Sequence, residues 1–287
     1  MNINGNTKLF CVIGDPIEHT LSPAMHNALF DNLKLNGVYT ALRVTPPFLE
    51  DFVKGIRTMD LGGVNVTIPH KVAIIDFLDE LSEEAQIIGA VNTIEMRGKK
   101  LIGHNTDGIG AIEALIQGGA DPKNKNVLIL GSGGAARAIG VTIALRSDVS
   151  SLTVLGIKKD ELKQLVDDIK NGTGVKVFSE LMDTGINQEL LKDSDIIIHC
   201  TPVGMYPTID QTIITAEEIP SHIKLMDIVY TPLETQLLKE AKKAGVETYI
   251  SGIDMFVNQG VESAKLWLKI DPPRDIMKQV VLDNLRD

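Results

Sequence analysis

A lysine between a strand and a helix is the first group in the sequence that could carry chemistry. The run Gly63–Ile68 alternates β-branched and short polar residues, which predicts a strand, and Pro69 stands where a helix can begin. We therefore expect Lys71 in the first turn of that helix, where the positive end of the helix dipole lowers the pKa of a lysine. Lys71 is thus a candidate acid/base group, although an ordinary exposed lysine fits the same pattern.

An aspartate in a glycine-rich turn is the second such group. Asp107 lies within Gly103–Gly110, where amide, hydroxyl and carboxylate side chains precede a helical pattern over 109–116. One interpretation is that Asp107 caps this helix. The other is that its carboxylate pairs with the ammonium group of Lys71 and holds that lysine partly protonated.

A glycine-rich loop indicates a dinucleotide site. The pattern Gly131-x-Gly133-x-x-Ala136 follows the apolar run 127–130 and opens a helical stretch, which is the context that dinucleotide binding requires. Glycines let the backbone approach a pyrophosphate, and the helix N-terminus supplies free N–H groups. A tight strand–helix turn is the simpler alternative. The predicted cofactor-binding residues of this loop are Gly131, Ser132, Gly133, Gly134, Ala135 and Ala136.

Strand-like and helix-like runs alternate along the chain, and this order predicts an α/β fold with parallel or mostly parallel sheets. A polar, turn-rich linker at 118–124 separates two such units. In the first unit we expect strands at 10–14, 38–44 and 63–68, helices at 22–33, 48–59 and 73–81, and a hairpin of 90–95 with 100–103. In the second we expect strands at 127–130, 152–155, 195–199, 225–228 and 248–250, and further helices from about Met255 and from Arg274.

Composition and charge exclude several classes of protein. With 287 residues, of which 44% are hydrophobic, the chain can bury one large or two medium cores. A net charge of −10 argues against general binding to nucleic acids or anionic membranes. Cys11 and Cys200 lie in apolar runs and are typical of buried thiols in a reducing compartment. Because no signal-like or transmembrane-length segment is seen, we expect a cytoplasmic protein.

Several motifs, in the same order, make the chain similar to the shikimate dehydrogenases. They are Val12–His19, Asn65–Lys71, Gly89–Thr93, Asp227–Pro232 and Asn258–Gly260. The resemblance implies an α/β, two-domain fold in which an N-terminal α/β substrate domain and a Rossmann-like dinucleotide-binding domain are separated by a cleft. It places the substrate-binding domain at 1–106, completed by C-terminal helices at 254–287, and the NADP-binding domain at 107–253.

The resemblance also implies an activity, the reversible oxidation of shikimate to 3-dehydroshikimate with NADP in aromatic amino acid biosynthesis. Lys71 would exchange the hydroxyl proton, and Asp107 would orient the substrate and tune Lys71. The implied substrate-binding residues are Thr20, Ser22, Asn65, Thr67, Asn92, Tyr230 and Gln259, and Lys158, Lys159, Thr201 and Gly252 join the loop in binding the cofactor. Ser22 also fits the N-cap of a helix that begins at Pro23. No metal is implied, and a monomer or a homodimer is expected.

Two departures from the family pattern concern the cofactor and the pocket. Gly156-Ile157-Lys158 stands where the family usually has Asn-Arg-Thr, so only lysines remain to hold a 2′-phosphate. We therefore expect NADP to be preferred over NAD by a reduced margin. His199 stands where the family usually has asparagine, and because no further ligands keep metal spacing, we interpret it as a core residue.

Two alternative functions remain open. The missing arginine is compatible with an NAD-linked quinate/shikimate dehydrogenase. A non-catalytic dinucleotide sensor on the same fold is the other alternative, but a sensor needs neither Lys71 nor Asp107. Absorbance of reduced nicotinamide, measured with shikimate or quinate and with either cofactor, separates the three functions.

Overall fold

The computed structural model describes residues 3–182 and 185–286, and the chain divides into two compact units. Unit 1 comprises Met1–Thr106 and Val257–Asp287, and unit 2 comprises Asp107–Phe256. Each unit contains a six-stranded sheet with helices, which confirms the predicted α/β class. The assignment of one segment to the substrate and of the other to the cofactor stays a prediction.

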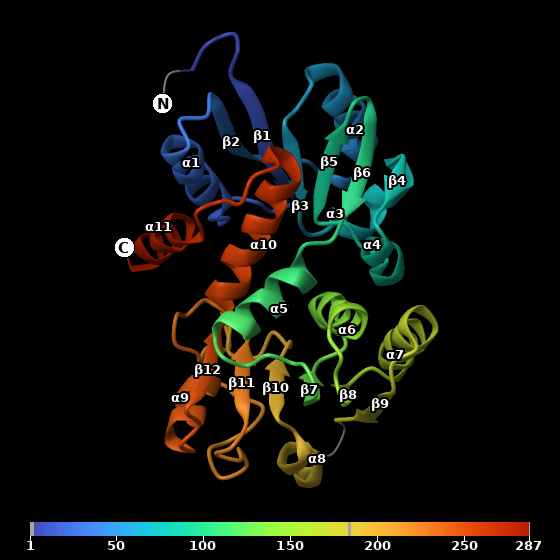
Figure 1. Cartoon of the computed structure of the whole chain (residues 1–287), viewed down its shortest axis with the longest axis vertical. Helices are drawn as coiled ribbons and strands as arrows, with labels where there is room; N and C mark the ends of the chain where they lie inside the picture. Colours follow the sequence, from blue (N-terminus) through green and yellow to red (C-terminus); the bar gives the residue numbers. More distant parts are fainter. Residues whose placement is uncertain (1–2, 183–184, 287) are drawn as a thin grey trace. The chain divides into compact units, whose positions relative to one another are not determined.

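Unit 1 is built on a mixed sheet of order β2-β1-β3-β5-β6-β4 (Figure 1). Its strands are β1 (Lys8–Gly14), β2 (Gly37–Arg43), β3 (Gly63–Val66), β4 (Glu80–Leu81), β5 (Thr93–Arg97) and β6 (Lys100–His104). β1 pairs in parallel with β2 and β3, whereas the β3–β5 and β5–β6 pairs are antiparallel. The predicted hairpin is therefore confirmed, as strands β5 and β6.

Helices of unit 1 come from both ends of the chain. They are α1 (Ser22–Asn32), α2 (Leu49–Met59), α3 (His70–Ala73), α4 (Glu83–Ile88), α11 (Arg274–Arg286) and, from Val257 onward, α10 (Gly252–Leu268). The 3-10 turns η1 (Pro46–Phe48) and η2 (Ile74–Phe77) precede α2 and follow α3. In α2 the buried residues Leu49, Val53 and Ile56 recur at helical spacing, so one face of the helix packs into the core.

The predicted helix over 73–81 is wrong. α3 ends at Ala73, η2 continues for one turn, and the backbone at Leu78 is extended, with φ −95° and ψ 155°. The carboxylate of Asp79 accepts a hydrogen bond from the backbone N–H of Leu101 at 2.7 Å, and the N–H of Asp79 donates to the carbonyl of Leu101 at 3.0 Å. These bonds begin the pairing of β4 with β6, and sheet pairing outweighs the helical spacing of the apolar residues.

Unit 2 is built on a sheet of order β12-β11-β10-β7-β8-β9 in which every pairing is parallel (Figure 1). Its strands are β7 (Asn126–Leu130), β8 (Ser151–Gly156), β9 (Val177–Leu181), β10 (Ile196–His199), β11 (Lys224–Asp227) and β12 (Thr248–Ser251). Its helices are α5 (Asp107–Gln117), α6 (Gly134–Arg146), α7 (Lys159–Thr173), α8 (Gln188–Asp193) and α9 (Gln236–Lys243). This strand order is that of the doubly wound dinucleotide-binding fold, in which ligands bind at the carboxyl ends of the strands where the order reverses, here between β7 and β10.

The edge strand β9 is not among the predicted strands. Only Val177 is fully buried, and Phe178, Ser179 and Glu180 are exposed. The ammonium group of Lys176 lies 4.8 Å from the centre of the Phe178 ring and covers it partly. An edge strand that buries so little leaves no alternating pattern in the sequence, so the strand can be assigned only from its pairing with β8.

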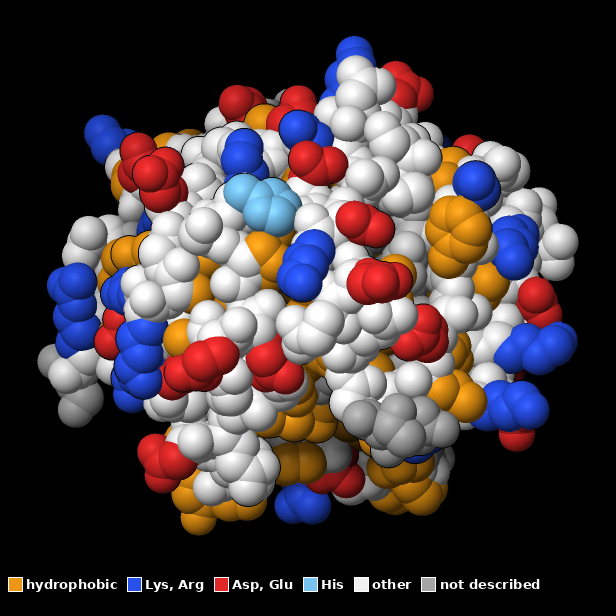
Figure 2. Space-filling view, turned by 90° about the horizontal axis from the view of Figure 1, so that it is seen from below, with side chains coloured by type: hydrophobic (Ala, Val, Ile, Leu, Met, Phe, Trp, Pro, Cys, Tyr) orange, Lys and Arg blue, Asp and Glu red, His pale blue; other side chains and the backbone are white. Residues whose placement is uncertain are grey.

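The surface carries charges of both signs. On the face shown in Figure 2, Asp and Glu side chains are interspersed with Lys and Arg side chains, and apolar side chains form separate groups. Mixed charge of this kind gives no extended positive field on that face for a polyanion. Among the described residues, no helix is both long and apolar enough to cross a membrane.

His26 lies in an aromatic cluster in the core of unit 1. Its ring stacks on Tyr39 with 4.4 Å between centroids and 12° between planes, and Phe30 and Trp267 lie beside it. His26 is buried, and within residues 3–182 and 185–286 neither of its ring nitrogens has a hydrogen-bond partner. Burial lowers the pKa of His26 to about 3, because a charged imidazole would lose its hydration there.

We predict that His26 makes the folded protein sensitive to acid. Below its ordinary pKa of 6.5 the unfolded chain binds a proton at His26, whereas the folded chain does not until about 3, so stability is complete above 6.5 and falls as the pH drops through this interval. The loss in the free energy of unfolding reaches roughly 4 kcal/mol at about pH 3. Urea unfolding of wild type and of His26→Phe at about pH 8 and about pH 5 should show a smaller pH effect in the variant. An equal pH effect in both proteins would contradict the prediction.

Candidate active site

Lys71 is held in place by hydrogen bonds of its own backbone and of its neighbour. It lies in α3, whose N-cap is Pro69, so its predicted position in a first helical turn is confirmed. The buried ring of His70 donates through Nε2 to the carbonyl of Val44 at 2.6 Å. The N–H of Val91 donates to the carbonyl of Lys71 at 2.7 Å. The backbone from which the half-buried Lys71 side chain extends is therefore fixed. Because α3 has only one turn, few peptide dipoles are aligned, and the helix dipole acts weakly on Lys71.

Thr20 and Ser22 place two hydroxyls side by side at the start of α1. The hydroxyl of Thr20 lies 3.2 Å from that of Ser22 and also accepts from the N–H of Ser22 at 3.3 Å. Ser22 is the first residue of α1, and the N-cap is Leu21, which makes no side-chain cap. The predicted capping role of Ser22 is therefore wrong. Thr20 Oγ1 thus accepts from the first N–H of α1, and the O–H groups of both residues can still donate to one carboxylate.

The side chain of Asn65 is buried in a network of hydrogen-bonded polar groups and does not lie on an exposed surface. Its amide nitrogen donates to the hydroxyls of Thr93 and Ser263, both at 3.0 Å. Its carbonyl oxygen accepts from the hydroxyl of Tyr39 at 2.7 Å, and that same hydroxyl also hydrogen-bonds Ser22. The Asn65 side chain is thus engaged within the protein on both of its polar atoms.

The same network contains two further predicted residues, Asn92 and Gln259. The Asn92 side chain accepts from the N–H of Thr106 at 2.8 Å and donates to its hydroxyl at 3.0 Å. Ser263 lies 3.2 Å from the hydroxyl of Thr106 and donates to the carbonyl of Gln259 at 3.0 Å. Unit 1 therefore brings Ser22, Asn65, Asn92 and Gln259 into one connected set.

Thr93, Thr106 and Ser263 were not expected at the site. Thr93 ends the motif Gly89–Thr93, from which only Asn92 was assigned to the site. Thr106 precedes Asp107 in the glycine-rich turn, and Ser263 lies outside the quoted motifs. Thr67 follows the end of β3, and its N–H donates to the carbonyl of Ile13 at 2.9 Å. The backbone of Thr67 therefore continues the pairing with β1, and this fixes the point from which its half-buried side chain extends.

The loop between β7 and α6 has the backbone that a dinucleotide requires. Gly131 has φ +122°, and a Cβ there would lie 2.9 Å from the carbonyl oxygen of Cys200, so no other residue fits without displacement. α6 begins at Gly134, and its N-cap, Gly133, makes no side-chain hydrogen bond. The first N–H groups of a helix of 13 residues are therefore not capped by a side chain and can bind a phosphate.

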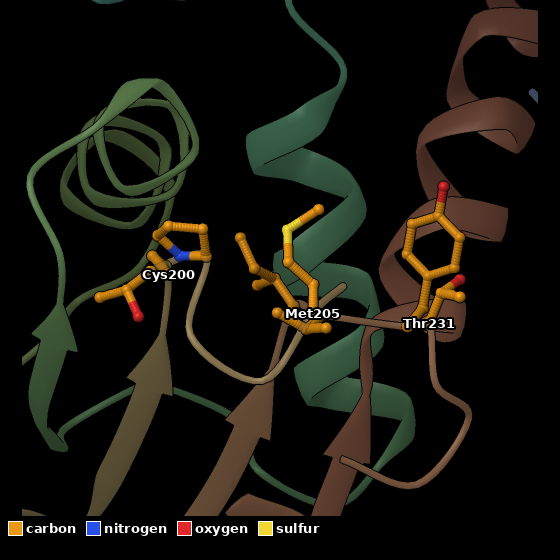
Figure 3. A pocket seen from close by; sticks show the side chains of 8 residues that line it. Cys200, Met205 and Thr231 are labelled. Atoms are coloured by element: carbon orange, nitrogen blue, oxygen red, sulfur yellow. The ribbon is translucent and has the colours of Figure 1, made fainter. Parts of the chain in front are cut away.

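A cavity of about 370 Å³ lies beyond the carboxyl ends of β10 and β11. Its lining comes from the two loops that follow these strands: Cys200, Thr201, Pro202, Met205, Ile228, Val229, Tyr230 and Thr231. Figure 3 shows Met205 between Cys200 and Thr231. Two predicted residues, Thr201 and Tyr230, thus share one pocket. Burial raises the pKa of Tyr230, whose ring stacks on Phe256 at 5.3 Å.

At Gly252 the backbone at the start of α10 passes close to the backbone of the loop that follows β11. A Cβ at Gly252 would lie 2.2 Å from the carbonyl oxygen of Ile228, so any side chain would displace the loop that carries Val229 and Tyr230. α10 begins at Gly252, and Asp254 lies in its first turn, where a carboxylate is stabilised by the helix dipole.

A chain of buried hydrogen bonds lies beneath the pocket. His199 Nδ1 lies 2.9 Å from a carboxylate oxygen of Asp227, and its Nε2 contacts the hydroxyl of Thr201. Asp227 also accepts from the N–H of Val229 at 3.0 Å and from the hydroxyl of Thr235 at 2.6 Å. His199 and Asp227 are buried, so the expected core position of His199 is confirmed. This chain connects the two loops that line the pocket.

The remaining predicted residues are Lys158, Lys159 and Asp107. Lys158 and Lys159 are exposed at the start of α7. Asp107 is the first residue of α5 in unit 2, whereas Lys71 belongs to unit 1. The pairing of Asp107 with Lys71 stays a prediction.

Comparisons with known proteins identify relatives along the whole chain. Residues 12–94 match the family model of the shikimate dehydrogenase substrate binding domain, and residues 252–282 match that of the shikimate 5′-dehydrogenase C-terminal domain. The shikimate dehydrogenase (NADP+) of Methanocaldococcus jannaschii is 41% identical over 284 residues, which cover 99% of each chain.

Solved structures agree with this match. A shikimate dehydrogenase in complex with NADP+ superposes with a TM-score of 0.90 at 40% identity, covering 99% of this chain and 98% of that one. The shikimate 5-dehydrogenase of Listeria monocytogenes in complex with shikimate and NAD gives a TM-score of 0.93 at 34% identity, covering 98% of each chain. The resemblance predicted from the motifs is confirmed.

We predict that the link between His199 and Asp227 stabilises unit 2. His199→Ala removes one partner of a buried carboxyl group and should lower the free energy of unfolding by about 2–4 kcal/mol. His199→Asn keeps a hydrogen-bond donor and should cost clearly less, and Thr201→Val, which removes only a hydroxyl, should cost about 1 kcal/mol. Chemical unfolding of the three variants tests this order. Equal losses for the alanine and asparagine variants would show that packing, and not the hydrogen bond, is what His199 contributes.

Proposed function

The chain belongs to the shikimate dehydrogenase family, and we propose that it catalyses the reversible NADP-dependent oxidation of shikimate to 3-dehydroshikimate, a step of aromatic amino acid biosynthesis. The observation that carries the proposal is the 41% identity to an NADP-linked relative over 99% of both chains. The doubly wound sheet of unit 2 and the hydroxyl-rich network of unit 1 support it independently.

The residues of unit 2 fit a dinucleotide. When bound, NADP supplies the hydride acceptor or donor. The N–H groups at the start of α6 would hold the pyrophosphate, and Gly131 would let the backbone approach it. The pocket with Thr201 and Tyr230 lies at the carboxyl ends of β10 and β11, beside the reversal of strand order, and would take the nicotinamide end.

Lys71 would move the proton of the reaction. In the oxidation, the carbon that bears the 3-hydroxyl loses a hydride to the nicotinamide, and the hydroxyl oxygen loses a proton. The neutral amine of Lys71 would accept that proton and return it in the reduction. Asp107 would accept a hydrogen bond from the substrate hydroxyl and would favour the charged form of Lys71 after transfer.

The other predicted residues would hold the substrate in position for this transfer. The hydroxyls of Thr20 and Ser22 would donate to the shikimate carboxylate, for which their spacing of 3.2 Å is suitable. Asn65, whose polar atoms are engaged within unit 1, would keep this surface in place. The remaining contacts with the ring hydroxyls and the nicotinamide side are assigned to Thr67, Asn92, Tyr230 and Gln259.

We also propose that the enzyme acts in the cytoplasm as a monomer or a homodimer. Cys11 and Cys200 are buried free thiols, and burial raises the pKa of Cys11 to about 12. Thiols of this kind are suited to a reducing compartment. Light scattering of the purified protein measures the oligomeric state directly.

One assay tests the proposed function. Reduced nicotinamide is followed by absorbance with shikimate or quinate as substrate and NADP or NAD as cofactor. Turnover of shikimate with NADP at the highest kcat/KM supports the proposal. A higher kcat/KM with quinate and NAD would favour the quinate-type enzyme, and binding of cofactor without turnover of either acid would favour a sensor.

We predict that Lys71→Ala lowers kcat by about 10²–10⁴ while shikimate binding is largely retained, since Lys71 is assigned to proton transfer. Asp107→Asn should also lower kcat, and the double variant should lose much less than the product of the two single effects, because the residues act as a unit. Steady-state kinetics and shikimate titration of the binary complex measure these quantities. A Lys71→Ala variant with kcat near that of the wild type would exclude Lys71 as the proton-transfer group.

We predict that Thr20→Val and Ser22→Ala raise the KM for shikimate more than they lower kcat. The carboxylate does not change during hydride transfer, so hydroxyls that bind it stabilise ground and transition states alike. The thermal midpoint is measured beside the kinetics as a control. A lower thermal midpoint with an unchanged KM would instead assign these hydroxyls to stability alone.

A further inference from the structure

Glu161 lies beside the glycine-rich loop and is not among the predicted site residues. It belongs to the first turn of α7, and a Cβ added at Gly133 would lie 3.7 Å from its Oε1 atom. The end of β8 also lies close to this loop, because a Cβ added at Gly156 would be 2.6 Å from the hydroxyl oxygen of Ser132. A carboxylate therefore stands where the loop, the end of β8 and the start of α7 meet.

This corner is where the adenosine ribose of a dinucleotide lies in a doubly wound fold. The pyrophosphate binds at the start of the helix that follows the first strand, and the ribose reaches the end of the second strand. In unit 2 these two places are the start of α6 and the end of β8. Glu161 thus faces the part of the cofactor at which NADP and NAD differ.

The position of Glu161 also changes the expected role of Lys158. Its Nζ atom lies 3.2 Å from Oε2 of Glu161, three residues along the chain. The lysine that was expected to attract a 2′-phosphate is therefore already paired with a carboxylate. The side chain of Lys158 is 74% exposed, so the pair is weak enough for a bound phosphate to compete for the lysine.

We infer that Glu161 is a cofactor-specificity residue, which accepts hydrogen bonds from the hydroxyls of an unphosphorylated ribose and opposes a 2′-phosphate. The inference rests on the proposed function, since it concerns the cofactor of the same site. A carboxylate at this corner binds a ribose diol well and repels a phosphate group. Glu161 also holds Lys158 away from the phosphate until NADP binds. The enzyme therefore uses NAD beside NADP, with a preference that Glu161 keeps small.

The test compares three variants of the full chain. Glu161→Gln removes the charge and keeps the shape, Lys158→Met removes the cation, and Asp160→Asn removes an equal charge from the neighbouring exposed position. Dissociation constants of NADP and NAD are measured by calorimetry without shikimate, and kcat/KM for each cofactor is measured with it. The thermal midpoint of each variant serves as a control for folding.

Glu161→Gln should raise the preference for NADP over NAD by about three- to tenfold, through tighter NADP and weaker NAD binding. Its NADP affinity should depend more strongly on salt, because Lys158 is freed to meet the phosphate. Lys158→Met should lower the preference, and Asp160→Asn should change it less than about twofold. An unchanged preference in Glu161→Gln, or an equal change in Asp160→Asn, would overturn the inference. Because the dissociation constants need no turnover, a protein that fails to oxidise shikimate would refute the proposed function and still test Glu161.

Discussion

Asp227 is a fully buried carboxyl group, and the need to satisfy it organises the pocket of unit 2. A carboxyl group away from water must accept hydrogen bonds from all sides, and here the donors are the ring of His199, the hydroxyl of Thr235 and the N–H of Val229. His199 ends β10, Val229 lies in the loop that follows β11, and Thr235 is the N-cap of α9. The pocket therefore keeps its form because its two loops share one acceptor. His199 supplies one of these donors and extends the chain of hydrogen bonds to Thr201.

The same constraint acts in unit 1 with neutral groups. Asn65, Thr93 and Ser263 form a closed set in which each hydroxyl or amide meets another within 3.0 Å. A set of this kind has few alternative arrangements, because breaking one contact leaves a buried group without a partner. The network therefore fixes the side chain of Asn92, which the proposed function assigns to the substrate.

Sequence reasoning predicted the parts of the molecule that local rules determine. The strand–glycine–helix order around Gly131 and the place of Lys71 after Pro69 follow from backbone geometry, and both are found. Residues 73–81 were misassigned because the hydrogen bonds of Asp79 to a distant strand outweigh local spacing. Ser263 and Glu161 were missed for a related reason. Their neighbours at the site come from other elements, and nothing in their own stretch of sequence records those neighbours.

The C-terminal part of α10 has a consequence for how the chain acquires its structure. Trp267 contacts Phe10 at 5.6 Å between ring centroids and donates from its indole nitrogen to the carbonyl of Ile94 at 3.0 Å. Unit 1 thus needs both ends of the chain, whereas unit 2 is one continuous segment, Asp107–Phe256. On the ribosome, unit 2 is complete in sequence while the core of unit 1 still lacks its tryptophan, because chains grow from the N-terminus and domains fold as units. The strands β1 to β6 are therefore made before unit 2, but their core is complete only after Trp267 has been made, and their apolar side chains can aggregate in the interval.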